Sequence, residues 1–554
     1  MNFYEEDPNL QGLLKAYLDD DFYRWADEQL EEFGEMCAHS IDERAVHTDR
    51  EGQPRLIKYN KFGEDISEVW LNEGYKRTVK ETYDKGIVGY VHKPIPELGR
   101  KGNYIYSFAQ GYLLSHAEPG FYCPVTLTMA TAYLIDHYAS DELKSAYLPH
   151  VLATGDVELN EGATFLTERQ GGSDVGVNEV QAIPDSDGYR IYGEKYFASN
   201  AGACGVAMVL ARMEGATSGS KGLSLFLVPW RQDDGSLNGI KIRRLKDKLG
   251  VRAVPSAEVE FEGAKAYLVG EAEQGFYYMM EALNLSRVCN AVASIGIMRR
   301  AYLEAREYAC ERTAFDHRLI EYPMVQDTLT TLAAKQEVET SAIFNMISRF
   351  DRIAEAPREA SQEEQILNRL LIAIMKKESA EQAIHFSHDA LELHGGNGFI
   401  EDFVTPRLLR DAQVLTVWEG TANILGLEVL RLVKRYDAHH LFQREVRDKL
   451  RQGAFDKGAQ LVEDELVKLE VFVEEVLQQT EDRQTYHSKH IAKRMADIFE
   501  GVTALTDANK GDARKQKIAE VFLEKTFQEE SGSGYPLTMQ YSEDILNVEV
   551  NAKV

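Results

Sequence analysis

The chain has 554 residues, of which 44% are hydrophobic and 27% charged, a composition typical of a globular protein with a large core and three or four domains. Its net charge of −28 argues against nucleic acid or an anionic membrane as a partner, because a negative field repels phosphate groups. No apolar run is long enough to predict a membrane span, and the opening MNFYEEDPNL predicts no secretory signal.

The first part of the chain, residues 1–155, is expected to form an N-terminal helical domain, in which residues 121–138 make a buried helix. The pattern then changes to short β-rich runs at residues 206–211, 223–228 and 257–261, with a hairpin-type Asp-Gly dipeptide at 187–188. Residues 156–274 are therefore predicted to form a central β-barrel-like domain.

The helical period returns after residue 275. Ile366, Leu370 and Ile374 recur every four residues and predict one buried helix face, and Gly395 suits the end of the helix that follows. We expect a C-terminal four-helix bundle over residues 275–436 and an additional helical domain over 437–554. Apolar residues at a 4-3-4-3 spacing predict a packing helix in that last domain, namely Val462, Leu466, Leu469, Val473 and Val476. The predicted fold class is α+β multidomain.

The five cysteines are odd in number and show no CxxC spacing. This pattern favours reduced thiols and a cytoplasmic location, and it predicts no metal site. No GxGxxG follows a predicted strand, which argues against a Rossmann-type cofactor site.

Two motifs in the β region carry groups suited to a flat or phosphorylated ligand. Residues 165–174, FLTERQGGSD, place small hydroxyl groups beside glycines, which can donate hydrogen bonds to a flavin ring or a pyrophosphate. Residues 195–200, KYFASN, offer Phe197 for stacking and Ser199 as a donor. An ordinary Gly-Gly loop and a plain core aromatic are the alternative interpretations.

Two further motifs lie at the start of the C-terminal helical region. Residues 284–287, NLSR, combine amide, hydroxyl and guanidinium groups, and residues 311–315, ERTAF, place an arginine near an aromatic ring. Arginine suits planar, bidentate phosphate contacts. A helix-start cap and a surface ion pair remain the alternatives.

The most informative stretch is 392–423, ELHGGNGFIEDFVTPRLLRDAQVLTVWEGTAN. Gly395, Gly396 and Gly398 would let the backbone approach a phosphate or a flat cofactor closely. Glu419, next to a glycine and to apolar Leu415, Val417 and Trp418, suits a general base whose pKa is raised by desolvation. The alternative is a surface carboxylate that caps a turn.

Together these motifs resemble the acyl-CoA dehydrogenase superfamily over roughly residues 85–435, and the larger layout resembles its branch of AidB-type flavoproteins and some long-chain acyl-CoA dehydrogenases. The resemblance implies FAD as cofactor, Glu419 as base, and acyl-CoA contacts from Ser173, Asn284 and Arg287. It implies FAD contacts from Leu166, Thr167, Gly172, Ser173, Phe197, Ser199, Arg312, Phe315, Gly395, Gly396, Thr421 and Asn423. The chain departs from the family pattern at Phe197, where tryptophan is commoner, at Asp316, usually glycine, and at Glu392, usually glutamine.

The activity implied is α,β-dehydrogenation of medium- to long-chain acyl-CoA thioesters. An electron-transfer flavoprotein as acceptor, and a dimer or tetramer with FAD contacts across subunits, follow from the same resemblance. Three alternatives stay open: a flavoprotein associated with DNA in alkylation stress, an acyl-CoA-binding sensor with low turnover, and an oxidase that uses O₂.

Overall fold

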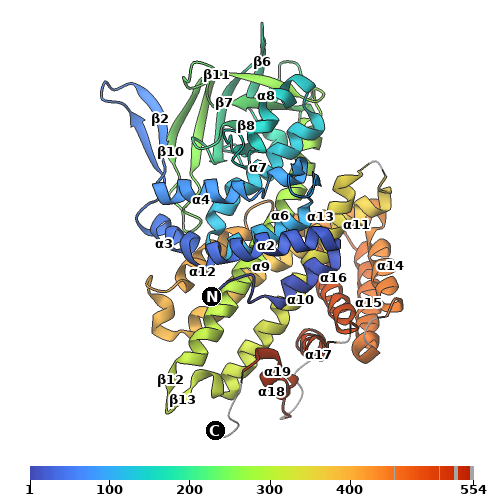
Figure 1. Cartoon of the computed structure of the whole chain (residues 1–554). Coiled ribbons are helices and arrows are strands. Elements are labelled where there is room, and N and C mark those ends of the chain that lie inside the picture. Colours follow the sequence, from blue (N-terminus) through green and yellow to red (C-terminus); the bar gives the residue numbers. More distant parts are fainter. Residues whose placement is uncertain (358, 454–455, 511, 529–533, 549–554) are drawn as a thin grey trace. The chain divides into compact units, whose positions relative to one another are not determined.

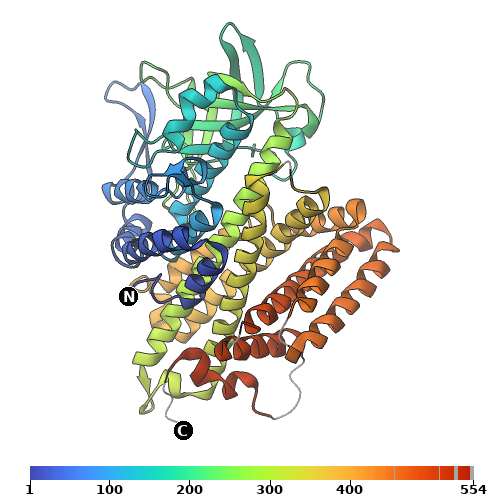
Figure 2. The same ribbon diagram turned by 45° about the vertical axis from the view of Figure 1, so that its right-hand side comes forward.

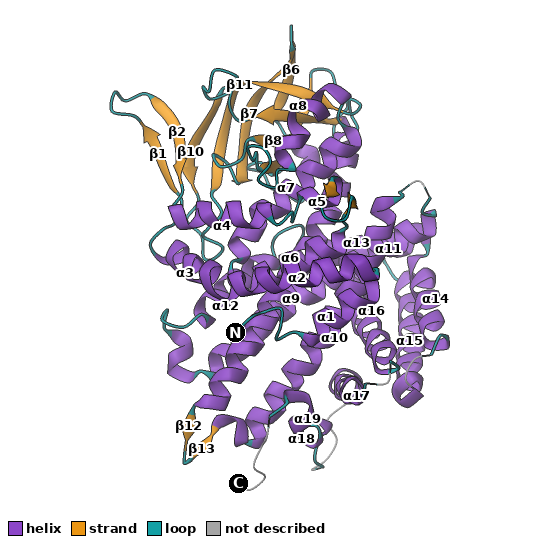
Figure 3. Ribbon diagram, viewed as in Figure 1, coloured by secondary structure: helices purple, strands orange, loops and turns teal. Residues whose placement is uncertain are grey.

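The computed structural model describes residues 1–357, 359–453, 456–510, 512–528 and 534–548 (Figure 1). Contacts divide the chain into two compact units. Unit 1 comprises Met1–Glu6 and Leu18–Cys289, and unit 2 comprises Asp7–Tyr17 and Asn290–Val554, so the division falls inside the long helix α9, Gly275–Glu311. A sheet lies in unit 1 and unit 2 is almost wholly helical (Figure 3), which confirms the α+β multidomain class.

Unit 1 begins with helices whose starts are fixed by side-chain caps. Asp19, Asn72, Asn103 and Ser140 each accept a hydrogen bond from a backbone N–H in the first turn of α2, α4, α6 and α8. The helices are α2 Asp20–Met36, a π-helical turn Cys37–Ile41, α3 Asp42–Arg50, α4 Glu73–Asp84, α5 Gly89–His92, α6 Tyr104–Ala117, α7 Pro119–Tyr138 and α8 Asp141–Val151. The predicted buried helix at 121–138 is confirmed as α7, most of whose residues are buried.

The sheet of unit 1 has seven strands in the order β10-β11-β7-β6-β8-β5, with β9 paired to both β8 and β11. The strands are β5 Gly162–Phe165, β6 Gln181–Asp185, β7 Gly188–Ser199, β8 Val206–Met213, β9 Leu223–Pro229, β10 Ile240–Leu245 and β11 Ser256–Val269. Because β9 bridges β8 and β11, the sheet curls around a core that includes Phe165, Phe226 and Trp230. The described residues also form hairpins of short strands. In unit 1 these are β1 Arg55–Tyr59 with β2 Asp65–Trp70 and β3 Pro94–Ile95 with β4 Arg100–Lys101. In unit 2, β12 Thr313–Ala314 pairs with β13 His317–Arg318.

Unit 2 is built from helices, the longest of which run side by side (Figure 2). They are α1 Pro8–Tyr17, the second part of α9, α10 Pro323–Glu355, α11 Gln362–Leu393, α12 Thr405–Leu415, α13 Ala422–Tyr436, α14 Ala438–Arg451, α15 Asp456–Leu477, α16 Glu481–Ala508, α17 Ala513–Phe527, α18 Leu537–Gln540 and α19 Ser542–Leu546. Ile366, Leu370 and Ile374 are buried, as predicted. The five apolar residues at 4-3-4-3 spacing are buried along α15, which packs against α16.

Two predictions from composition concern the cysteines and the membrane. All five cysteines are free, so no disulfide forms among them. In the described ranges no helix combines the length and the apolarity that crossing a bilayer requires. The domain boundaries at residues 155, 274 and 436 stay a prediction.

A buried carboxylate in unit 1 makes stability depend on pH. Glu161, just before β5, is within 3.0 Å of the Tyr83 hydroxyl. Burial raises the pKa of Glu161 to about 7, although the Tyr83 hydroxyl opposes the shift. Because the folded chain holds this proton more tightly than the unfolded chain, stability falls as the pH rises from about 4.5 to about 7.

We expect Glu161→Gln to remove this loss. Relative to the wild type, the variant should gain about 2 kcal/mol of unfolding free energy between about pH 5.5 and about pH 8, measured by urea unfolding. Exposed Glu158, replaced by Gln, is the matched control and should show no such difference. A gain for Glu161→Gln that is the same at both pH values would contradict the assignment.

Candidate active site

In unit 1 the loop after β5 is held against strand β7 by a buried ion pair. Lys195, fully buried in β7, donates to Glu168 Oε1 at 2.8 Å and to the Leu166 carbonyl at 3.1 Å. Glu168 also accepts the backbone N–H of Glu179 and Val180. The lysine of the KYFASN motif is therefore a support for the loop, and it fixes the backbone at Leu166.

The predicted cofactor residues of this loop lie next to those of β7. The Tyr196 N–H donates to the Thr167 carbonyl at 3.0 Å, so the backbone of the loop runs beside the strand that carries Phe197 and Ser199. A side chain at Gly172 would meet the Thr167 hydroxyl at 2.5 Å, which explains the second glycine of the pair. Leu166 and Thr167 are half-buried, whereas Gly172 and Ser173 are exposed.

Phe197 and Ser199 differ in their surroundings. The Phe197 ring is 55% exposed, with the Lys246 ammonium 4.9 Å from its centroid. It is therefore no core aromatic and is open for stacking. The Ser199 hydroxyl lies 3.1 Å from the Ser256 hydroxyl of β11, so it has a protein partner in this structure.

The predicted acyl-CoA residues Asn284 and Arg287 are brought together one turn apart on α9. The Arg287 guanidinium donates to Asn284 Oδ1 at 3.1 Å. Arg287 is buried, which is inconsistent with a surface arginine. Asn284 thus orients the guanidinium, which is the group able to bind a planar anion.

In unit 2 the ERTAF motif runs from the end of α9 into a short hairpin, with Phe315 at its tip. Arg312 follows the last residue of α9, and the turn between β12 and β13 places Phe315 and Asp316 in the left-handed region, at φ 50° and 69°. Aspartate tolerates this conformation better than most residues, which explains how it replaces the usual glycine. The Phe315 side chain is 91% exposed at the tip.

The glycine pair follows α11 and leaves its backbone bare. Gly395 has φ 59°, and a Cβ at Gly395 or Gly396 would meet nothing within 4 Å. The prediction of open backbone is wrong for Gly398, which is buried, because a Cβ there would meet the Leu391 carbonyl of the same chain at 2.2 Å. The Glu392 side chain is exposed and lies near the exposed His388, so it belongs to the protein surface. A flat, phosphorylated cofactor needs open backbone and exposed aromatic rings. The glycine pair offers the first, and Phe197 and Phe315 each offer the second, so these residues fit a flavin.

Glu419 lies in the turn between α12 and α13, in the left-handed conformation at φ 54°. Such a conformation is unfavourable for glutamate and is found where the surroundings enforce it. The enforcing contacts come from two buried side chains that the sequence motifs did not reveal. Asn290 of α9 donates to Glu419 Oε2 at 3.0 Å and to the Leu415 carbonyl at 3.2 Å, and Lys376 of α11 donates to the Gly420 carbonyl at 2.8 Å.

The environment of Glu419 matches the expected apolar surroundings only in part. Leu415 is buried, Trp418 is half-buried and Val417 is 60% exposed, so Val417 does not shield the carboxylate. Glu419 itself is half-buried and oriented by a hydrogen bond, which contradicts a freely solvated surface carboxylate. Thr421 and Asn423, at the start of α13, are exposed on the same turn.

Comparison with protein-family models gives three matches along the chain. Residues 273–433 match the C-terminal domain of acyl-CoA dehydrogenases, residues 163–264 match the middle domain of the same family, and residues 1–155 match the N-terminal domain of the adaptive response protein AidB. The last match supports placement in the larger AidB-like branch.

Similar proteins point the same way. Acyl-CoA dehydrogenase family member 11 of Caenorhabditis elegans is 31% identical over 543 residues, 94% of this chain and 86% of that protein. Putative acyl-CoA dehydrogenase AidB of Escherichia coli K12 is 30% identical over 428 residues, 75% of this chain and 76% of its own. The crystal structure of Caenorhabditis elegans ACDH-11 in complex with C11-CoA is similar with a TM-score of 0.88 at 27% identity, covering 96% of this chain and 92% of that one. The chain belongs to the acyl-CoA dehydrogenase family of FAD-dependent oxidoreductases that act on acyl-CoA.

Proposed function

We propose that the chain catalyses α,β-dehydrogenation of medium- to long-chain acyl-CoA thioesters, with Glu419 as the base that removes the α-proton. The observation that carries this proposal is the enforced conformation of Glu419, with its carboxylate fixed by Asn290. A carboxylate that only capped a turn would need neither the unfavourable backbone angle nor a buried amide donor.

The α-proton of a thioester is too weakly acidic for a carboxylate in water, so the site must stabilise the developing enolate oxygen. The backbone N–H of Glu419 is the proposed donor from this chain, and losing one such donor costs about 3–4 kcal/mol in other enzymes. FAD, when bound, supplies the acceptor for the β-hydrogen as hydride. The Glu419 carboxylate, held by Asn290 Nδ2, is proposed to take the proton.

The residues proposed to hold FAD form one group in each unit. In unit 1 they are Leu166, Thr167, Gly172, Ser173, Phe197 and Ser199, and in unit 2 they are Arg312, Phe315, Gly395, Gly396, Thr421 and Asn423. Ser173, Asn284 and Arg287 are proposed to bind acyl-CoA. The largely exposed Phe315 ring suits a contact with a second subunit, so we propose a dimer or tetramer.

The substrate range is extended from a relative, and the acceptor from the family resemblance. The Caenorhabditis elegans protein was crystallised with C11-CoA, which supports a medium to long acyl chain here. An electron-transfer flavoprotein is the proposed acceptor, and the cytoplasm is the proposed location.

An anaerobic titration tests the proposal. The purified chain should show flavin absorbance, and acyl-CoAs of graded length should bleach it, most strongly in the medium to long range. Bleaching without turnover on an artificial electron acceptor would favour the sensor alternative, and peroxide release would identify an oxidase. Retention on duplex DNA at about 0.15 M salt would favour the stress-related alternative, since weak phosphate contacts fade with salt. A colourless protein would overturn the proposal.

Asn290 is expected to act as a positioning residue. Replacing it with Leu removes a hydrogen bond to a charged group, worth about 1.5–3 kcal/mol, and should slow flavin reduction about 10- to 100-fold. Because the amide favours the ionised form of Glu419, its loss should also move the pH profile of reduction to higher pH. Stopped-flow reduction across pH measures both effects.

The same substitution at Asn368, a buried residue of α11 outside the motifs, controls for general damage to unit 2. If Asn290→Leu slows reduction with no movement of the pH profile, the amide does not act through the Glu419 carboxylate.

A further inference from the structure

A buried histidine in unit 2 lacks the hydrogen bonds that its ring requires. His439, in the first turn of α14, is 2% exposed, and among the described residues neither of its ring nitrogens has a hydrogen-bond partner. Leaving a buried polar group unsatisfied costs about 1–3 kcal/mol, so such a group in a native fold calls for an explanation. An imidazole with a free lone pair is also the commonest metal ligand in proteins.

Two further ligand groups face the His439 ring. Glu474 of α15 places Oε1 3.6 Å from His439 Nε2, which is longer than a hydrogen bond. The ring of His440 lies against that of His439, with centroids 4.0 Å apart. One ligand atom from each of the three residues lies within 4.8 Å of the others.

One of these separations is close to that in a zinc centre, and the others are within reach of it. With Zn–N and Zn–O bonds of about 2.0–2.2 Å, the ligand atoms of a tetrahedral site are about 3.3–3.5 Å apart. The His439–Glu474 pair is nearly at that distance already. His440 and Glu474 are both exposed and can close the remaining gap by side-chain rotation.

A supporting contact also fits metal binding. His440 Nδ1 lies 3.2 Å from Gln443 Oε1 of the same helix. When His440 donates from Nδ1 to this oxygen, Nε2 keeps its lone pair for a metal, and metal-bound histidines usually have such a partner on the other nitrogen.

A cluster of three carboxylates elsewhere in unit 2 shows why the His439 group is the better candidate for a metal site. Glu339, Glu378 and Glu500 also gather within ligand distance. The Lys335 ammonium already occupies their centre, 3.2, 3.0 and 2.7 Å from the three carboxylates. That cluster carries its own cation. The His439 ring faces the Glu474 carboxylate, and among the described residues no cation is bonded to the ring.

We propose that His439, His440 and Glu474 bind a divalent transition metal of the zinc class, with water as fourth ligand. The site joins α14 to α15, and it is independent of the proposed dehydrogenation. Its role is structural: metal binding cross-links two helices of the region after residue 437 and stabilises that region.

The test uses the untagged full-length flavoprotein after removal of metal with a chelator. Zn²⁺ is titrated against a chromophoric chelator, and thermal unfolding is followed with and without Zn²⁺. We expect one tight equivalent and a rise in the unfolding temperature. His439→Gln and Glu474→Gln should each weaken binding by at least about 10- to 100-fold, the loss seen for even a supporting residue.

Glu474→Gln alters an exposed side chain, so it keeps the test decisive should His439→Gln fail to fold. Glu475→Gln, the neighbouring exposed residue on α15, is the matched control and should bind Zn²⁺ as the wild type does. The proposal fails if the wild type takes up no tight equivalent, or if Glu474→Gln binds Zn²⁺ with unchanged affinity.

Discussion

Glu419→Gln is expected to abolish reduction of the flavin by acyl-CoA while leaving the yellow cofactor bound. The substitution keeps the size of the side chain and its oxygen for Asn290, but it removes the group that accepts the α-proton. General base catalysis contributes about 100- to 10,000-fold, so the rate of bleaching should fall by that amount. Stopped-flow absorbance under anaerobic conditions measures it directly.

Glu401→Gln provides the matched control for this result. Glu401 is an exposed residue of the loop between the glycine pair and α12, paired with Arg410 at 3.1 Å. Its substitution should leave bleaching unchanged. Normal bleaching in Glu419→Gln would show that another group takes the proton. That outcome would refute the role of Glu419 without refuting the dehydrogenase activity.

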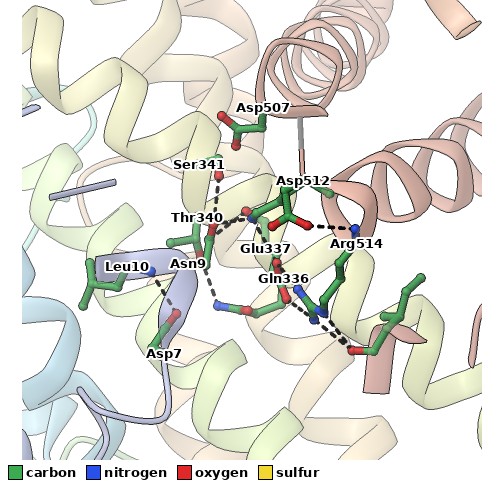
Figure 4. Close-up of polar contacts among 12 residues, drawn as sticks. Asp7, Asn9, Leu10, Gln336, Glu337, Thr340, Ser341, Asp507, Asp512 and Arg514 are labelled. Carbon is green, nitrogen blue, oxygen red and sulfur yellow. Dashed lines mark hydrogen bonds and ion pairs between the residues drawn. The ribbon is translucent and has the colours of Figure 1, made fainter. Parts of the chain in front are cut away.

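The largest stability effect is expected from Glu337→Gln, in the network shown in Figure 4. Arg514 of α17 donates two hydrogen bonds to the buried Glu337 carboxylate, at 2.5 and 2.9 Å, and Lys515 donates a third at 3.0 Å. Burial would raise the pKa of Glu337, but Lys515 and Arg514 outweigh it and lower the pKa to about 2. The pairing therefore stabilises the folded chain at neutral pH.

Loss of the charge should cost about 3 kcal/mol at pH 7, the free energy that corresponds to this pKa difference. Because the folded pKa is depressed, the contribution is present above about pH 4.5 and is lost as the pH falls towards 2. Urea unfolding at pH 7 measures the cost. Glu355→Gln, at an exposed position on the same helix, should cost almost nothing; an equal cost at both positions would mean that the ion pairs add no stability.

Local patterns in the sequence were sufficient for the fold class and for the motifs. The helical period located α7 and the buried face of α11, and the Asp-Gly dipeptide located the hairpin between β6 and β7. Each of these depends on neighbours within one turn of helix or one strand pair, which is the range over which periodicity and turn chemistry act.

Contacts between distant residues were beyond such patterns. Asn290 is an isolated polar residue in an apolar helical run, and its partner is 129 residues further along the chain. Glu258 stands in an alternating strand yet is buried, because Arg244 of the neighbouring strand β10 and Lys246, just after that strand, pair with it. The lone asparagine within an apolar run was the one available signal for the support of Glu419.

The membership of α1 in unit 2 has a consequence for synthesis of the chain. Asn9 donates to the Glu337 carbonyl at 3.3 Å (Figure 4). It also accepts a hydrogen bond from Lys515, 506 residues later. At a ribosomal rate of about 5–20 residues per second, the nascent helix waits at least about 25 seconds for Lys515. Docking of α1 is thus one of the last events in folding of the chain. A label fused ahead of Met1 would still be attached to α1 when it docks.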